Sequence, residues 1–192
     1  MIKLTQRSFL VALACGVFAL TTVSVEAAKK VKTEDELIAD LASPKEDEVA
    51  STMLKLEKQF PTSPKTIAAI KKYLGANRPK VRRKAARVIS VLHADVTSEE
   101  IKTICELLKA SDFREIMDGL IALRGLKAAE ALPQITPLLN HSAPNVIRDA
   151  CRTIAKLGNK EHLPLLEPLL KHADAKVQKD AQDAIFELKN KS

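Results

Sequence analysis

Positively charged side chains are concentrated in one segment of this sequence. Nine Lys and Arg residues and no acidic residue lie between Pro61 and Ala94, whereas the rest of the chain after residue 27 has 20 basic and 23 acidic residues. Arg83 and Arg87 stand four residues apart, so a helix would bring both guanidinium groups to one side. Such groups bind carboxylates and phosphates through charge-assisted hydrogen bonds. The segment indicates an acidic or phosphorylated partner, with a solvated helix face as the alternative interpretation.

The remaining polar residues form no catalytic motif. The sequence has no nucleophile elbow, glycine-rich phosphate loop, zinc-binding histidine pair or paired catalytic carboxylates, and we interpret its Asp and Glu residues as scattered over helix surfaces. Cys105 and Cys151 lie within apolar patterns of helical spacing, so we expect two buried thiols, with a disulfide as the less favoured alternative. We therefore predict no catalytic residue, no cofactor and no metal site, and we do not expect an enzyme.

The elements that position the arginines belong to an internal repeat. Residues 132–159 and 163–190 align at an offset of 31, with 12 identities in 28 positions. Each copy predicts a first helix, a polar turn and a second helix with the pattern Val-x-x-x-Ala-x-x-x-Ile-x-x-Leu, which places apolar residues on one helix face. The same pattern begins upstream at Val81. A fixed period of this length indicates a stack of helical hairpins.

The repeat predicts about five hairpins and about ten helices. A small residue, which lets each second helix approach its own first helix closely, recurs at Ala85, Gly119, Ala150 and Ala181. Pro137 and Pro168 lie inside two first helices, where we expect kinks. We predict a repeat domain over 34–192 after a short linker, 28–33, with units at about 34–60, 63–95, 97–129, 131–160 and 162–191.

This pattern resembles the HEAT repeat, in particular the short bacterial kind also found in phycobilin-lyase-like proteins. The resemblance rests on Pro-x-x-x-Pro-Leu-Leu and on the second-helix pattern, and it covers residues 63–190 well and 34–62 loosely. It implies an all-α fold, an α-solenoid stacked as a right-handed superhelix. The family usually places an Arg directly after the Val and an Asp in the turn, which form a ladder between repeats. Arg82 fits this place, whereas Ile147 and Gln178 occupy it in the last two repeats.

The resemblance also suggests a binding surface. In HEAT-like stacks the second helices line the concave side, which would point Arg83 and Arg87 into a groove. The repeat-equivalent positions are Met117 and Ile121, then Arg148 and Arg152, then Lys179 and Asp183. We predict that the four arginines, with Met117 and Ile121 as an apolar patch between them, contact a partner. The alternative interpretation makes Met117 and Ile121 additional core residues.

Two histidines also occupy equivalent places, His141 and His172. Corresponding atoms in neighbouring repeats are about 10 Å apart, whereas zinc ligands all lie about 2 Å from one ion. We therefore expect no shared metal site at these histidines.

Residues 1–27 have the layout of a secretory signal peptide. A short basic stretch precedes an apolar run over 9–20, and we expect cleavage between Ala27 and Ala28. An uncleaved N-terminal anchor is the alternative. The prediction is a periplasmic or secreted protein that does not span a membrane.

Three functional hypotheses follow from these features. The first is an exported, non-catalytic scaffold, expected to be a monomer, that binds a protein or peptide, including an acidic one, on its concave surface. The second is a module that binds a polyanion through its basic repeat: a surface polymer, a lipid headgroup or nucleic acid. Export and the scarcity of aromatic residues disfavour nucleic acid. The third, a lyase-like accessory enzyme, rests on the resemblance alone.

Overall fold

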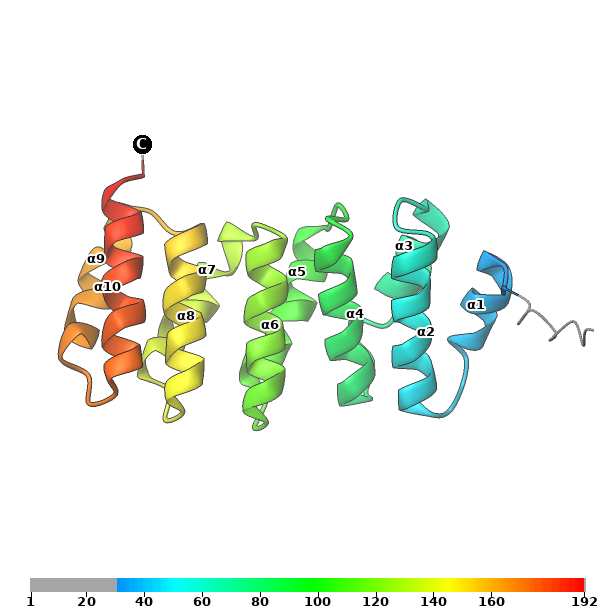
Figure 1. Ribbon diagram of the computed structural model, residues 1–192, viewed down its shortest axis with the longest axis horizontal. Helices are drawn as coiled ribbons and strands as arrows, with labels where there is room; N and C mark the ends of the chain where they lie inside the picture. Colours follow the sequence, from blue (N-terminus) through cyan, green and yellow to red (C-terminus); the bar gives the residue numbers. More distant parts are fainter. Residues whose placement is uncertain (1–30, 192) are drawn as a thin grey trace, which may run out of the picture. The chain divides into compact units, whose positions relative to one another are not determined.

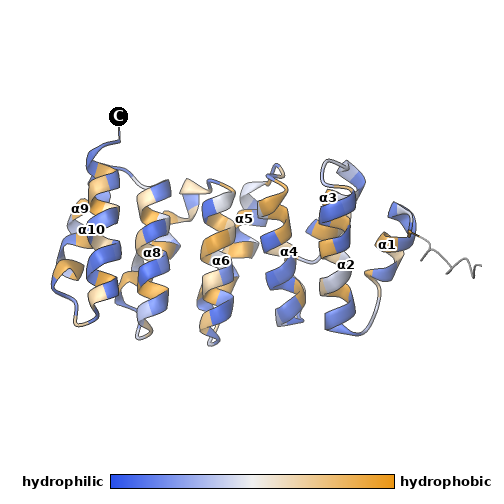
Figure 2. Cartoon of the chain, viewed as in Figure 1, coloured by the Kyte–Doolittle hydropathy of each residue, from blue (hydrophilic) through white to orange (hydrophobic). Residues whose placement is uncertain are grey.

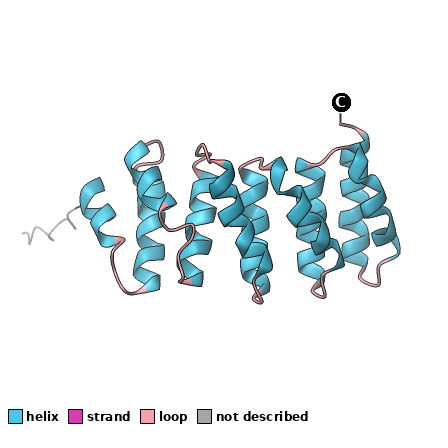
Figure 3. Ribbon diagram, turned by 180° about the vertical axis from the view of Figure 1, so that it is seen from behind, coloured by secondary structure: helices cyan, strands magenta, loops and turns pink. Residues whose placement is uncertain are grey.

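The computed structural model describes residues 31–191, and the chain from Lys32 onward forms one compact unit. Within the described residues the chain is entirely helical, with ten α-helices and five short 3₁₀-helices and no strand. The helices pair into five hairpins whose second helices form one row and whose first helices form another behind it (Figure 1). Figure 3 shows the row of first helices from the opposite side. The predicted α-solenoid of about five hairpins is confirmed.

The two rows have different helix lengths. The second helices are α2 (Glu46–Gln59), α4 (Pro79–Val91), α6 (Phe113–Gly125), α8 (Pro144–Leu157) and α10 (Ala175–Lys189). The first helices are α1 (Glu34–Asp40), α3 (Pro64–Lys71), α5 (Ser98–Cys105), α7 (Leu132–Ile135) and α9 (Leu163–Leu166). The 3₁₀-helices are η1 (Glu106–Lys109), η2 (Ala129–Ala131), η3 (Thr136–Asn140), η4 (Lys160–His162) and η5 (Glu167–Lys171). Successive second helices pack directly against each other, from α2 through α10.

Local sequence signals fix where these helices begin. Thr33 and Thr97 form capping boxes with the Glu three residues later, at the starts of α1 and α5. The Asp112 and Asp174 side chains accept backbone N–H groups at the starts of α6 and α10. Because each cap satisfies amide groups that have no partner within the helix, it sets the register of the helix that follows.

Prolines shape the first helices of the last two hairpins. In both, the α-helical turn ends at the residue two before the internal proline, and a 3₁₀-helix that contains Pro137 or Pro168 follows. Proline lacks the N–H group that an α-helix needs in its interior, so the chain tightens there instead of continuing. This change from α-helix to 3₁₀-helix falls at the two prolines where we expected kinks.

The core follows the predicted pattern. Ala85, Ala150 and Ala181 are buried, and so is Gly119, where an added Cβ would lie 3.0 Å from the Leu107 Cβ. The second helices therefore need a small side chain at this position, which we call the small position of each repeat. By the register of its helix start, Thr52 occupies it in the first repeat and is likewise buried.

Both described cysteines are free and buried, as expected from their apolar surroundings. Burial raises the pKa of the Cys105 thiol to about 11 and that of the Cys151 thiol to about 12. The predicted signal peptide, with Ala27 and Ala28 at its cleavage site, lies outside the described residues. Among the residues that are described, none of the helices has the length and apolar character needed to cross a bilayer.

Candidate functional site: the ladder face

One exposed side of the second helices carries all six predicted contact residues. These residues lie two positions before or two positions after the small position, and they define what we call the ladder face: Arg83 and Arg87 on α4, Met117 and Ile121 on α6, and Arg148 and Arg152 on α8. The structure thus brings the predicted residues to one side of three adjacent helices. Their partners, however, differ from the prediction.

Arg83 and Arg87 are bound within the chain. Arg83 donates from Nε to Asp118 Oδ2 at 2.7 Å, and Arg87 donates from Nη1 to Asp118 Oδ1 at 3.3 Å. Asp118 lies on α6 and is buried, so one carboxylate joins two arginines of the preceding repeat. The Arg83 guanidinium also lies 3.7 Å from Asp112. The next helix therefore partly covers Arg83, whereas the Arg87 side chain remains exposed although it is paired.

The same arrangement recurs at the last pair of helices. Arg148 donates from Nε to Asp180 Oδ2 at 2.6 Å, and Arg152 contacts both Asp180 oxygens through Nη2, at 3.0 and 3.1 Å. Asp180 lies on α10 at the place that Asp118 has on α6, immediately before the small position. The stack therefore has two identical clusters in which an arginine pair of one repeat meets a carboxylate of the next.

The junction between the third and fourth repeats lacks such a cluster. There Asp149 occupies the carboxylate position, but the preceding repeat presents Met117 and Ile121 in place of arginines. Asp149 instead accepts a hydrogen bond from Arg152 of its own helix, at 3.3 Å. Among residues 31–191, no ion pair joins α6 to α8; Arg124 reaches only the Thr153 hydroxyl, at 3.4 Å.

Met117 and Ile121 extend an apolar stripe along α6. Phe113, four residues before Met117, is exposed at the start of the helix, and its ring lies 5.7 Å from the Arg114 guanidinium carbon. Met117 packs against the core and remains partly accessible. Ile121 is half-buried. Figure 2 shows apolar colour on the side of α6 that faces the viewer. The core interpretation thus holds in part for Met117, and contact of the two residues with a partner stays a prediction.

Most of the basic second repeat is also engaged by neighbouring repeats. Lys65 and Lys80 pair with acidic residues of the first repeat, and Arg78 donates to two of its backbone carbonyl groups. Lys71 pairs with Glu100 of the third repeat at 2.9 Å. Together with the three arginines of α4, seven of the nine basic residues contact a neighbour. The local charge is therefore largely matched by the acidic first repeat and by carboxylates of the third.

Arg82 is the residue that fits the arginine place of the HEAT ladder. Its Nη2 and Nε lie 2.6 and 3.1 Å from Glu115 Oε2, and Glu115 is buried on α6. The resemblance led us to expect the acidic partner in the turn before the helix, and the structure instead places it within the next helix. The other described arginine–carboxylate contacts between repeats come from the pairs Arg83 and Arg87, and Arg148 and Arg152, which lie outside the family's usual arginine place.

The two equivalent histidines, His141 and His172, each accept a backbone hydrogen bond within the turn of their hairpin. His141 Nδ1 accepts the Ala143 N–H, and His172 Nδ1 accepts the Asp174 N–H, both at 3.0 Å. Each ring thus closes the turn between the two helices of its hairpin. Among residues 31–191, no group of three or more His, Cys, Asp and Glu side chains is arranged to hold a metal ion.

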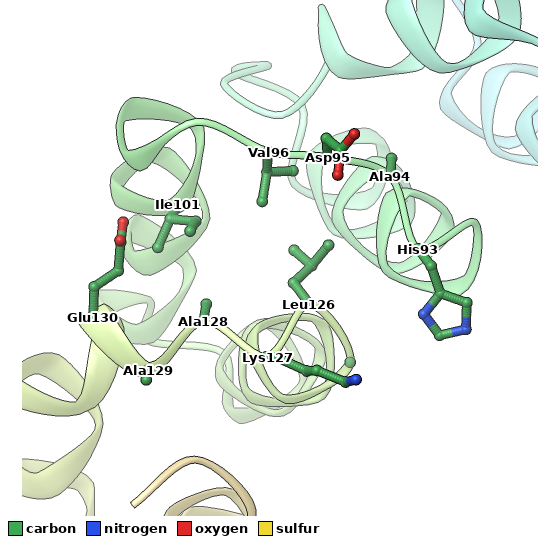
Figure 4. Close-up of a pocket in the computed structure, with 11 residues that line it drawn as sticks. His93, Ala94, Asp95, Val96, Ile101, Leu126, Lys127, Ala128, Ala129 and Glu130 are labelled. Atoms are coloured by element: carbon green, nitrogen blue, oxygen red, sulfur yellow. The ribbon is translucent and has the colours of Figure 1, made fainter.

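A cavity of about 760 Å³ lies between the loops that follow α4 and α6. His93 and Lys127 lie on one side of it and Glu130 on the opposite side (Figure 4). Both His93 and Lys127 have positive φ angles, 48° and 55°, because each continues the chain just beyond a helix end without a glycine. The ionisable groups around this cavity have mixed charge and do not converge on one point, so they define no ligand chemistry.

Sequence reasoning missed the carboxylates that complete the ladder. Asp118, Asp149 and Asp180 are 31 residues apart, so the repeat spacing itself marked them as one structural position. The interpretation of the acidic residues as scattered over helix surfaces was wrong for these three, which are all buried.

Comparisons with known proteins agree with this architecture. A family model for HEAT repeats matches residues 101–185. The structure is similar to a chain in the complex of CpcE and CpcF of phycocyanin lyase from Nostoc sp. PCC7120, with a TM-score of 0.68 and 20% identity over 88% of this chain and 71% of that chain. Two crystal structures of engineered proteins give TM-scores of 0.57 and 0.56, with 19% and 21% identity, over 80% and 82% of this chain and 78% and 48% of theirs. No curated protein matches the sequence. At these identities the structural likeness shows the fold alone.

Proposed function

We propose that this protein is an exported, non-catalytic HEAT-repeat scaffold that binds a protein or peptide partner on its ladder face. The architecture supports this, because a row of stacked hairpins offers an extended surface. The similar CpcE chain was solved in a complex with another protein, CpcF. That is an analogy of fold, so the surface itself must carry the argument.

The observation that carries the proposal is the apolar stripe of Phe113, Met117 and Ile121 between two arginine clusters. Exposed apolar side chains flanked by polar groups are characteristic of protein interaction sites. The Arg87 and Arg152 side chains beside the stripe are 49% and 46% exposed, so they keep donor groups open to solvent. A suitable partner segment would present an apolar side chain to α6 and carboxylates to the arginines on both sides.

The geometry favours this hypothesis over polyanion binding. A phosphate polymer needs several free cationic groups along its path, and seven of the nine basic residues of the second repeat already contact neighbouring repeats. Lys72 and Lys84 are the two without a described hydrogen bond or ion pair to a neighbouring repeat. The apolar stripe on α6 would also contribute nothing to the binding of a polyanion, whereas a protein partner would bury it.

Export is the second part of the proposal. It rests on the basic and apolar pattern of residues 1–27, with cleavage between Ala27 and Ala28. Mass spectrometry of the native protein should find its N-terminus at or near Ala28, in a periplasmic or secreted fraction. Recovery of the form that begins at Met1 from the cytoplasm would refute this part and restore nucleic acid as a partner class.

The binding experiment compares two exposed phenylalanines. The protein is used to capture partners from an envelope extract, with Phe113→Glu as the test variant and Phe186→Glu, on the terminal helix α10, as the matched control. We expect a stoichiometric protein to be retained by the wild type and the control and lost with Phe113→Glu. Salt-sensitive retention of polyanions that Phe113→Glu does not change would refute a protein partner on this face.

A further inference from the structure

We infer that the protein self-associates tail to tail, with α10 of one copy packed antiparallel against α10 of a second. The inference replaces the expectation of a monomer and is independent of the proposed partner site. The outer surface of the fifth repeat is partly apolar. Terminal repeats normally present a polar outer face, because no further repeat covers it.

Equivalent positions in the fourth and fifth repeats show the difference. Ala155 is 3% exposed in α8, whereas its equivalent in α10 is Phe186, which is 70% exposed. Likewise Leu139 is 5% exposed, and its equivalent Leu170 is 42% exposed. The fifth repeat covers the two residues of the fourth, and nothing described covers the two residues of the fifth. One of them is an aromatic ring where the interior repeat has only a methyl group.

Phe186 lies on the face of α10 directed away from α8. Gln178, Gln182 and Phe186 follow one another at intervals of four residues and share this face, whereas Asp180 and Ala184 are buried on the side of α8. The two glutamines replace Ile147 and Cys151, which are buried in the fourth repeat. The face is therefore polar at one end and apolar at the other.

This pattern is self-complementary when two copies meet antiparallel. A two-fold axis near Ala181 and Gln182 would place Phe186 of one copy over the Gln178 stem of the other. The same axis would place Lys179 of one copy opposite Asp183 of the other, two residues that pair within α10 at 2.7 Å. Because the symmetry repeats each contact, the Phe186–Gln178 contact and the Lys179–Asp183 contact would each form twice.

The opposite end of the stack gives no such surface. In the second repeat, Val81 and Val88 are buried on α4, and their spacing of seven residues places them on one side of the helix. Their equivalents in the first repeat are Glu48 and Lys55, which are exposed. A head-to-tail contact would place Phe186 against these charges, so the tail-to-tail arrangement is favoured over an open filament. It would also turn the ladder faces of both copies to the same side.

Sedimentation velocity of the purified protein over a range of concentrations tests the inference. We expect a monomer–dimer equilibrium that Phe186→Glu weakens by at least about tenfold, because the change removes buried apolar area and places a carboxylate against the Gln178 stem of the other copy, twice in each dimer. Phe113→Glu is the matched control and should leave the dimer unchanged. A wild-type protein that remains monomeric at millimolar concentration, or a dimer that Phe113→Glu disrupts equally, would overturn the inference.

Cross-linking determines which ends meet. Gln182→Cys should form a disulfide-linked dimer under mild oxidation, because Gln182 is exposed and lies beside the proposed two-fold axis, where equivalent residues approach each other, and Cys105 and Cys151 are buried. Lys55→Cys, an exposed position on the surface of the first repeat that a head-to-tail contact would use, is the control and should form none. If only the double variant with both cysteines forms linked chains, the contact is head to tail and the tail-to-tail assignment is refuted.

Discussion

The junctions on either side of the third repeat solve the same packing problem differently. At the second–third junction Asp118 binds two arginines of the preceding helix. At the third–fourth junction Met117 and Ile121 occupy the arginine positions, and the equivalent Asp149 accepts a hydrogen bond from Arg152 of its own helix. The repeat positions correspond, and the side chains at them differ. One pair of positions can therefore either join neighbouring repeats or present an accessible apolar surface.

The energetic consequences of the two solutions also differ. A buried carboxylate with two guanidinium partners is costly to break, although its net contribution to stability is small. Apolar side chains at the same positions contribute by burial and leave no charge to satisfy. The third–fourth junction is thus the one least dependent on charge, and it lies beside the surface that we propose for partner binding.

The largest expected effect comes from deleting the last repeat. Removing residues 162–192 deprives Arg148 and Arg152 of Asp180 and exposes the buried flank of α8. We expect aggregation or a fall in Tm of more than about 10 °C, measured by calorimetry. A shortened chain that is soluble and melts at the temperature of the full chain would show that the repeats do not share one core.

The thiols report on the same deletion. Burial raises the pKa of Cys151 to about 12, so in the full chain this thiol should not react with DTNB at slightly alkaline pH. In the shortened chain it should react, because the fifth repeat that covers it is missing. Cys105 is buried in the third repeat and serves as the internal control, which should remain unreactive in both proteins.

A smaller effect distinguishes the two kinds of junction directly. Asp118→Ala leaves Arg83 and Arg87 without their shared carboxylate, and we expect a loss of about 2 kcal/mol in the free energy of unfolding. Asp149→Ala removes a similarly buried carboxylate at the same repeat position, and we expect a change within about 1 kcal/mol. Urea denaturation measures both. Equal losses would contradict the difference between the junctions.

Much of the architecture was predictable because each signal is local to one hairpin. The 31-residue spacing, the small position and the internal prolines gave the number of hairpins, the buried face and the broken first helices correctly. Phe186 could also have been identified, since alignment with Ala155 shows a large apolar residue at the last place in a series. The missing step was to compare the terminal repeat with an interior one.

The arginine contacts could not be obtained from one helix alone. A single-helix projection places Arg83 and Arg87 away from the core of their own hairpin and therefore in solvent. In a stack, that flank meets the next helix, so the environment of each arginine is set by a residue about 30 positions later. The third repeat separates the two kinds of group, because it has the carboxylate of Asp118 and has Met117 and Ile121 at the arginine positions.

The smallest effect comes from supplying the missing arginine. Met117 occupies the place on α6 that Arg83 has on α4, so Met117→Arg should bring a guanidinium to Asp149. The substitution also removes partly buried apolar area, so its separate effect on stability should be close to zero. The informative quantity is the coupling between Met117→Arg and Asp149→Ala in a double-mutant cycle, which we expect to be about 1 kcal/mol. The control cycle pairs Met117→Arg with Asp118→Ala and should give a smaller value, because Asp118 is already bound by two arginines. A coupling of zero at Asp149 would mean that the third–fourth junction differs in backbone geometry as well as in side chains, and the equivalence of the two junctions would fail.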